Sequence, residues 1–170
     1  EYIMKNLAQT TLLAFLLGTC AFATADHHLG AHYDGSQVKH VGYSELGEPA
    51  TVLEVKSETS RALGQGEVRV TVLAAPINPS DWLQIAGNYG VDPVLPARPG
   101  SEGVGRVTEV SPDVQALKIG QLVLLASGST WAEELVAPAA GFLPLPDLGP
   151  IGAEVIEQLA MSTGNPLTAL

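Results

Sequence analysis

Tyr89 is the residue whose type and surroundings most suggest acid–base chemistry in this sequence. It lies between Asn88 and Gly90 at the end of the stretch APINPSDWLQIAGNYG, residues 75–90. From Asn78 onward the stretch has turn-forming and helix-starting residues, followed by glycines that end any short helix. A tyrosine in such a loop is either a packed amphipathic side chain or a placed proton donor, and its type alone favours packing.

Metal binding is the second chemistry that the residue types allow. His27, His28 and His32 lie in the polar segment ADHHLGAHYDGSQ, residues 25–37. Because no other ligand type accompanies them at a regular spacing, a flexible, solvated leader over residues 26–37 is the favoured interpretation. Cys20 is the only cysteine, and it lies in a segment that we expect to be removed. The mature chain is therefore expected to have no disulfide and no thiolate metal site, and we assign no metal-binding residue.

The N-terminal segment MKNLAQTTLLAFLLGTCAFATA, residues 4–25, is predicted to be a secretory signal peptide that follows three upstream residues. Its apolar centre is too short to span a bilayer, which takes about 20 apolar residues. Alanines near its end fit a cleavage site, so we expect export to the periplasm without stable membrane insertion. A buried core helix and a lipoprotein anchored through Cys20 are weaker alternatives, the second because Thr19 suits lipidation poorly.

Composition limits the possible classes of function. The chain has 170 residues, 46% of them hydrophobic, which suits one domain or one domain and the start of another. It carries 8 basic and 18 acidic residues, a formal net charge of −10. Phosphate backbones repel so acidic a chain, and we therefore expect no nucleic-acid partner.

Short strands dominate the predicted secondary structure from Val38 onward. Runs such as VRVTV and TVLEVKS alternate apolar and polar residues, as half-buried antiparallel strands do. Strands are expected within residues 37–46, 51–59, 66–77, 102–111, 121–127 and 132–146. This spacing indicates a mainly β fold, an antiparallel sandwich or barrel. One longer helix is expected over residues 151–164, and NPLTAL begins another.

Four segments, in order, resemble the N-terminal half of the medium-chain dehydrogenase/reductase superfamily. They are GEVRVTVLAAPINPSDWLQIAGNYG, LPARPGSEGVGRVTEVSPDVQALKIGQLVLL, TWAEELVAPAAGFLPLP and NPLTAL. INPSD, GNYG and NPLTA are most similar to mitochondrial-type 2-enoyl thioester reductases, with quinone oxidoreductases as near relatives. The resemblance implies a GroES-like antiparallel β-barrel with short helices over residues 38–150, and then a Rossmann domain that binds NADPH.

The Rossmann domain itself is not expected within this sequence. No G-x-G-x-x-G follows a strand, and GSEGVG, residues 100–105, opens a strand and not a helix. Residues 151–170 are therefore predicted to be the start of a truncated cofactor-binding domain. Zinc-dependent members of the superfamily carry a cysteine where this chain has Asn78 and a His-Glu pair where it has Ser101 and Glu102, so the zinc-independent branch is implied.

The resemblance also implies roles for single residues. In enoyl reductases the tyrosine of GNYG stabilises or protonates the enolate that hydride transfer creates, and here that residue is Tyr89. Asn165 and Thr168 of NPLTA are implied to contact the cofactor. Asn78 and Trp82 are implied to line the substrate pocket, with Trp82 as a core or cleft-wall aromatic. We expect Asp81 to cap a helix or accept a buried hydrogen bond, and Ser101 and Glu102 to be structural.

These expectations leave several functions open. The first is the substrate side of an NADPH-dependent, zinc-independent oxidoreductase that reduces the activated C=C bond of a small enoyl thioester or a quinone, as a homodimer when complete. The second is an exported β-barrel binding module without catalysis, and the third is a truncated gene product. The predicted signal peptide agrees better with the second, because exported compartments hold little free NADPH.

Overall fold

The computed structural model describes residues 35–164. The predicted signal peptide, most of the leader with its histidines, Cys20, and the two residues predicted to contact the cofactor, Asn165 and Thr168, lie outside this range. Across residues 35–164, no helix combines the length and the apolar character needed to cross a membrane.

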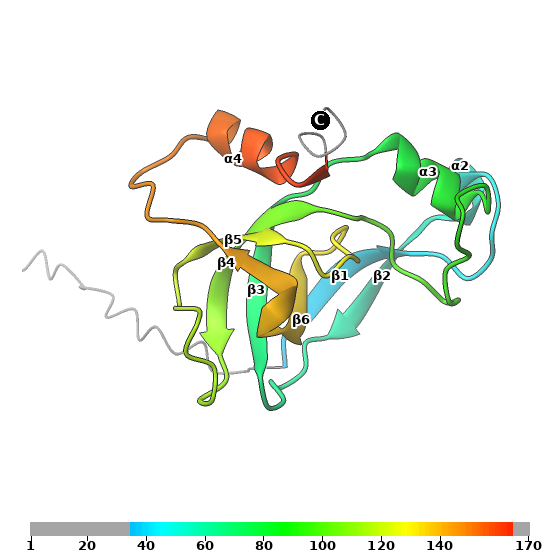
Figure 1. Cartoon of the computed structure of the whole chain (residues 1–170). Helices are drawn as coiled ribbons and strands as arrows, with labels where there is room; N and C mark the ends of the chain where they lie inside the picture. The colour runs from blue at the N-terminus through cyan, green and yellow to red at the C-terminus, as the bar shows by residue number, and fades with distance from the viewer. Residues whose placement is uncertain (1–34, 165–170) are drawn as a thin grey trace, which may run out of the picture.

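A curved antiparallel sheet of five strands forms the body of the domain (Figure 1). Its strands lie side by side in the order β6-β3-β4-β5-β7. Their bounds are β3 Glu67–Ala74, β4 Gly103–Val110, β5 Leu122–Leu125, β6 Glu134–Pro138 and β7 Phe142–Pro144, with a 3-10 turn, η1 Ala139–Gly141, between the last two. The two long strands, β3 and β4, lie at the centre and carry the pairing on both sides.

A two-stranded ribbon extends this sheet. It pairs β1 Gln37–Gly42 with β2 Glu54–Thr59. The segment before β6 joins the ribbon to the main sheet, because the Val41 N–H donates to the Trp131 carbonyl and the Glu133 N–H donates to the Lys39 carbonyl. The resulting structure is a partly closed antiparallel barrel, which confirms the predicted mainly β fold.

The core lies on one face of β3, β4 and β5. It is made of Val68, Val70, Val107, Leu117, Val123, Leu125, Leu135 and Phe142. Val68 and Val70 alternate with Arg69, which points to the opposite face and is also buried. Close packing of β3 on β4 explains Gly105, since a Cβ there would lie 2.8 Å from the Thr71 carbonyl oxygen.

Three helices accompany the strands: α2 Pro49–Val52, α3 Pro79–Ile85 and α4 Ala153–Ala160. Helix α4 packs against β3, β4 and β5. Figure 1 shows α3 and α4 at the same end of the main sheet, with β4 beginning below them. The chain therefore brings two segments far apart in sequence to one rim of the barrel.

Three predicted elements differ from the structure. The single strand expected over residues 132–146 is two strands, β6 and β7, separated by the 3-10 turn η1. The expected strand over residues 51–59 begins as helix α2, because Pro49 suits the first helical position and the Val52 N–H donates back to the Glu48 carbonyl. The expected helix over residues 151–164 is shorter, since α4 ends at Ala160. Just beyond it the Ser162 hydroxyl donates to the Leu159 carbonyl at 2.7 Å, a local bond that competes with further helix.

Replacing Glu67 with glutamine is expected to weaken the acid dependence of stability. Arg61 donates to its carboxylate at 2.6 and 2.7 Å, and the Gly64 N–H donates at 2.7 Å. The hydrogen bonds from Arg61 and then Gly64 lower the pKa of Glu67 to about 2. A lowered folded-state pKa stabilises the fold fully above the unfolded value of 4.5, and this contribution is lost as the pH falls toward 2.

Urea denaturation over this acid range measures the effect. Because Arg61 is more than half exposed, solvent screens the pair, and Glu67→Gln should reduce the acid-dependent loss of stability by on the order of 1 kcal/mol. Glu45→Gln, at an exposed site outside any helix or strand, is the matched control and should change stability over this pH range far less than Glu67→Gln does. Equal profiles for Glu67→Gln and the native chain would contradict the prediction.

Candidate active site

Helix α3 begins at the sequence predicted to start it, and its start fixes the position of Asn78. Pro79 occupies the first turn, and Asn78 is the N-cap residue. The Asp81 carboxylate is buried and accepts a hydrogen bond from the Asn78 backbone N–H at 2.9 Å. Asp81 therefore acts as a buried hydrogen-bond acceptor at the helix start, as predicted, and it holds Asn78 at the barrel rim.

Tyr89 lies in the loop after α3, at the edge of a pocket of about 510 Å³. Helix α3 stops at Ile85, and Gly87, with φ of +74°, turns the chain toward the rim. The tyrosine is 51% exposed, so its side chain is not a core packing residue and stays accessible from the pocket. The pocket walls include Asn78, Tyr89, Ser101, Glu102, Leu125 and Gly164.

Glu102 is the central polar group of this pocket. It stands directly before β4 and is only 3% exposed. Its carboxylate accepts hydrogen bonds from Asn78 Nδ2 at 2.9 Å, from the Thr163 N–H and hydroxyl at 3.1 and 2.5 Å, and from the Gly164 N–H at 2.6 Å. Burial disfavours the charged carboxylate, but the bonds from Thr163, Gly164 and Asn78 outweigh it and lower the pKa of Glu102.

Two further residues support the site, and the sequence did not single them out for this. Thr130 is fully buried, and its hydroxyl donates to the Glu102 carbonyl at 2.7 Å. The Trp131 indole N–H donates to the Pro76 carbonyl at 2.9 Å and so holds the strand end that leads to Asn78. Both are neighbours in sequence but reach the site from across the sheet, a contact that no local pattern indicates.

The structure separates Trp82 from the pocket. Asp81 and Ile85, four residues apart, take the buried face of α3, so the adjacent Trp82 faces outward and is 45% exposed. The core position considered for Trp82 is therefore wrong, and its side chain does not line the pocket that contains Tyr89.

The pocket combines a narrow polar side with an apolar wall. Asn78 and Ser101 contribute an amide and a hydroxyl, with Asn78 Nδ2 3.4 Å from Ser101 Oγ. Leu125 and Ala126 form the apolar wall. Tyr89 adds a phenol at the open edge. Such a site can orient a small polarised group by hydrogen bonds and offer it a proton, while the apolar wall accommodates carbon atoms.

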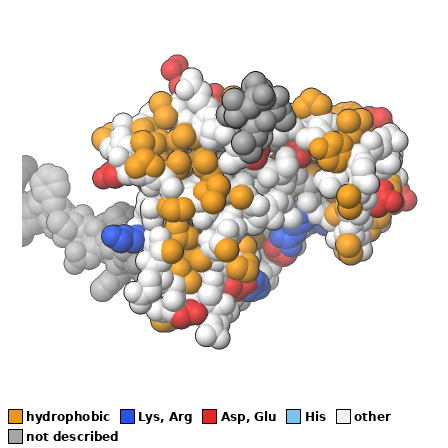
Figure 2. Space-filling view, in the orientation of Figure 1, with side chains coloured by type: hydrophobic (Ala, Val, Ile, Leu, Met, Phe, Trp, Pro, Cys, Tyr) orange, Lys and Arg blue, Asp and Glu red, His pale blue; other side chains and the backbone are white. Residues whose placement is uncertain are grey.

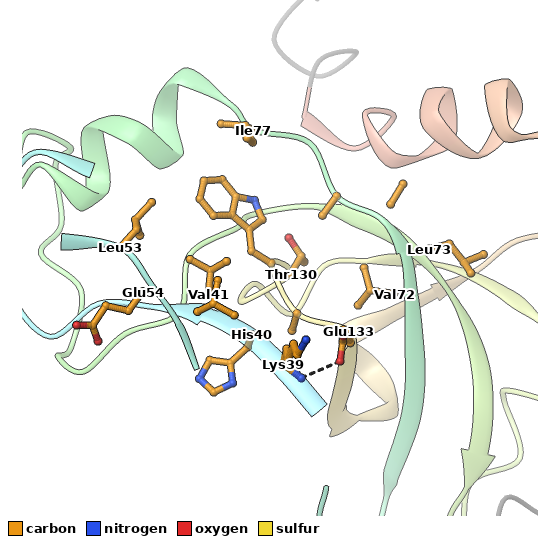
Figure 3. A pocket seen from close by; sticks show the side chains of 15 residues that line it. Lys39, His40, Val41, Leu53, Glu54, Val72, Leu73, Ile77, Thr130 and Glu133 are labelled. Atoms are coloured by element: carbon orange, nitrogen blue, oxygen red, sulfur yellow. Dashed lines mark hydrogen bonds between the residues drawn. The ribbon is translucent and has the colours of Figure 1, made fainter. Parts of the chain in front are cut away.

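A larger pocket of about 670 Å³ lies between the β1–β2 ribbon and the end of β3. Figure 3 shows Leu53 and Val41 on the ribbon side and Val72 and Leu73 on the sheet side, with Ile77 above. Its charged groups are at the edge, where Glu133 accepts a hydrogen bond from the Lys39 backbone N–H at 2.8 Å (Figure 3). Tyr89, Asn78 and Glu102 do not line this pocket, so the smaller pocket is the candidate active site.

Apolar side chains are exposed on both sides of the candidate site. Figure 2 shows them gathered over α4 on one side and over the α3 end of the molecule on the other. Val91 and Val94, in the loop after Tyr89, are 78% and 90% exposed.

Within residues 35–164, no group of three or more His, Cys, Asp or Glu side chains is placed to hold a metal ion.

Comparisons with known proteins agree on the kind of domain. The alcohol dehydrogenase GroES-like domain family matches residues 64–147. The mitochondrial enoyl-acyl-carrier-protein reductase of Rattus norvegicus is 38% identical over 166 residues, which are 95% of this chain and 43% of that protein. The corresponding Homo sapiens reductase is 39% identical over 142 residues, 82% of this chain and 36% of that protein.

Solved structures give the same result. Etr1p, in a complex described as containing NADP and crotonyl-CoA, matches with a TM-score of 0.70 and 31% identity over 79% of this chain and 42% of that chain. A Bacillus thuringiensis protein assigned as an NADPH:quinone reductase matches with a TM-score of 0.69 and 36% identity over 79% of this chain and 39% of that chain. The chain therefore spans less than half the length of these relatives.

The barrel, the zinc-site positions occupied by Asn78, Ser101 and Glu102, and these matches lead to one assignment. The chain belongs to the medium-chain dehydrogenase/reductase superfamily and carries the GroES-like domain of that superfamily's N-terminal half.

Proposed function

We propose that this domain forms the substrate side of an NADPH-dependent reductase that reduces the C=C bond of a 2-enoyl thioester. The observation that carries the proposal is the accessible phenol of Tyr89 at the rim of the pocket that also holds Asn78. The names of the relatives support it, since the rat and human proteins are enoyl-acyl-carrier-protein reductases. A quinone is the second candidate substrate, because the name of the Bacillus thuringiensis protein points to one.

The described residues would meet the nicotinamide end of NADPH and not its phosphates. Gly164 brings only backbone to the pocket wall next to Glu102, which leaves that wall without a bulky side chain. No glycine-rich phosphate loop occurs in the sequence, so the phosphates would be held by residues that follow this domain. Asn165 and Thr168 remain the residues proposed to contact the cofactor. When bound, NADPH would supply the hydride.

The residues of this domain would then control the charge that hydride addition creates. Addition at the β-carbon of an enoyl thioester places negative charge on the α-carbon and the thioester oxygen. The Tyr89 hydroxyl would donate its proton to the α-carbon, and solvent would reprotonate the phenolate because Tyr89 is half exposed. The Asn78 amide would orient the substrate within reach of Tyr89, and Leu125 would exclude water from the apolar side.

The test uses a full-length reductase, meaning this chain joined to a nucleotide-binding domain of its superfamily. The consumption of NADPH is followed with crotonyl-CoA, longer trans-2-enoyl thioesters and a quinone as alternative substrates. We expect oxidation of NADPH with the thioesters and formation of the saturated thioester. Reduction of the quinone alone would replace the proposal with the second candidate, and no turnover with either would refute the reductase assignment.

A further inference from the structure

We infer that Glu102 is a positioning residue that fixes Asn78 and the backbone of Thr163 and Gly164 to one point on the barrel rim. The inference deepens the proposed function, because it concerns the pocket in which Tyr89 would act. Glu102 was expected to be a structural remainder of a zinc-site position. In the structure it instead joins the two segments that form opposite sides of the candidate active site.

The two carboxylate oxygens serve different segments. Oε1 accepts the bond from Asn78 Nδ2, at 2.9 Å, and so faces the start of α3. Oε2 accepts all three bonds from the segment after α4, at 3.1 and 2.5 Å from Thr163 and at 2.6 Å from the Gly164 N–H. Because one rigid, planar carboxylate makes both sets of bonds, movement of one segment relative to the other must break some of them.

The surroundings of Glu102 leave its carboxylate little freedom. The Thr130 hydroxyl donates to its backbone carbonyl at 2.7 Å. On the other side, a Cβ on Gly164 would lie 2.8 Å from Glu102 Oε1, closer than real Cβ contacts allow. A side chain at residue 164 would therefore push against the Glu102 carboxylate, whereas glycine lets the N–H of residue 164 approach it without such a shift.

Glu102 is not placed to transfer a proton itself. Its side chain is buried, and the donors of Asn78, Thr163 and Gly164 all favour the charged carboxylate. An acid that is already ionised, and whose oxygens are occupied by donors, gives no proton to a substrate. Its effect on chemistry must pass through the groups it holds. These are Asn78 in the pocket and the backbone that leads directly to Asn165.

Amide hydrogen exchange in the 170-residue chain tests the contact without any need for activity. Glu102→Met removes the acceptor while keeping most of the side-chain volume, and the Gly164 amide should then exchange about 10-fold faster or more. Glu102→Gln keeps one acceptor oxygen and should restore most of the protection. Thr163→Val removes a single donor without a cavity and should accelerate Gly164 less than Glu102→Met does.

Thr108→Val provides the matched control for Thr163→Val. The Thr108 hydroxyl donates to the Arg69 carbonyl at 3.3 Å within the sheet, away from the pocket. This variant should leave exchange at Gly164 unchanged. If Glu102→Met fails to fold, exchange at the Gly164 amide in Thr163→Val still tests the inference. Unchanged exchange at Gly164 in a folded Glu102→Met or in Thr163→Val would overturn the inference.

Steady-state kinetics of the full-length reductase distinguish a positioning role of Glu102 from a purely structural one. Thr163→Val should lower kcat of the folded enzyme about 5-fold, with KM for the enoyl thioester within about twofold. A structural role alone would lower the melting temperature and leave kcat of the folded enzyme as it was, which would also overturn the inference. If Gly164 loses protection as expected but the protein reduces neither thioesters nor quinones, the proposed function fails and the contact made by Glu102 stands.

Discussion

Replacing Tyr89 with phenylalanine is expected to lower turnover of enoyl thioesters by the full-length reductase about 100-fold or more, because a placed general acid contributes roughly that factor. The change removes one hydroxyl and keeps the ring, so the pocket wall and the substrate contacts of the ring remain. KM should therefore stay within about threefold of the native value. Steady-state oxidation of NADPH at varied thioester concentration measures both constants.

Trp82→Phe is the matched control for this substitution. Trp82 is an aromatic residue of comparable exposure, 45% against 51% for Tyr89, and lies outside the pocket. Its replacement should leave kcat within about twofold of the native value, since its side chain does not line the pocket that contains Tyr89 and Asn78. Native turnover in Tyr89→Phe would exclude Tyr89 as the proton donor, and the proton would then come from water.

The parts of this domain that follow local rules could be predicted from the sequence. Alternation of apolar and polar residues located β3 and most of β2, and the order Asn78, Pro79, Ser80, Asp81 located the start of α3. Alternation failed at residues 51 and 52, where an apolar run behind Pro49 forms helix α2. A short apolar run fits both a strand and a helix turn, and the proline decided between them.

The connections within the site could not be predicted in the same way. Glu102 lies 61 residues from Thr163, and the contact exists only because α4 returns to the rim where β4 begins. The family resemblance placed Glu102 at a position next to the catalytic zinc of zinc-dependent members. It therefore suggested only a structural role for Glu102. One feature of the sequence could have indicated the contact. Glu102 lies between small residues at the start of an apolar strand, and a carboxylate is buried in such a place only where hydrogen-bond donors compensate its charge.

Replacing Arg69 with methionine is expected to reduce the free energy of unfolding by about 3–5 kcal/mol, the usual effect of removing one partner of a buried ion pair. Arg69 is 5% exposed on central strand β3. It donates to Glu109 on β4 at 2.8 Å, to Glu134 on β6 at 2.5 Å and to the Arg61 carbonyl at 2.5 Å. Methionine fills similar space but leaves two partly buried carboxylates without a cation.

Combining Arg69→Met with Glu109→Gln and Glu134→Gln tests this cause. If the loss comes from uncompensated charge, the triple variant should recover more than half of the stability lost by Arg69→Met, because its glutamines leave no buried charge. Arg106→Met, at an exposed arginine on β4, is the control and should change the free energy of unfolding by less than about 1 kcal/mol. Urea denaturation at neutral pH measures all three variants. If the triple variant is as unstable as Arg69→Met, then packing of the arginine side chain, rather than the pairing of its charge, holds β3 to its two neighbours.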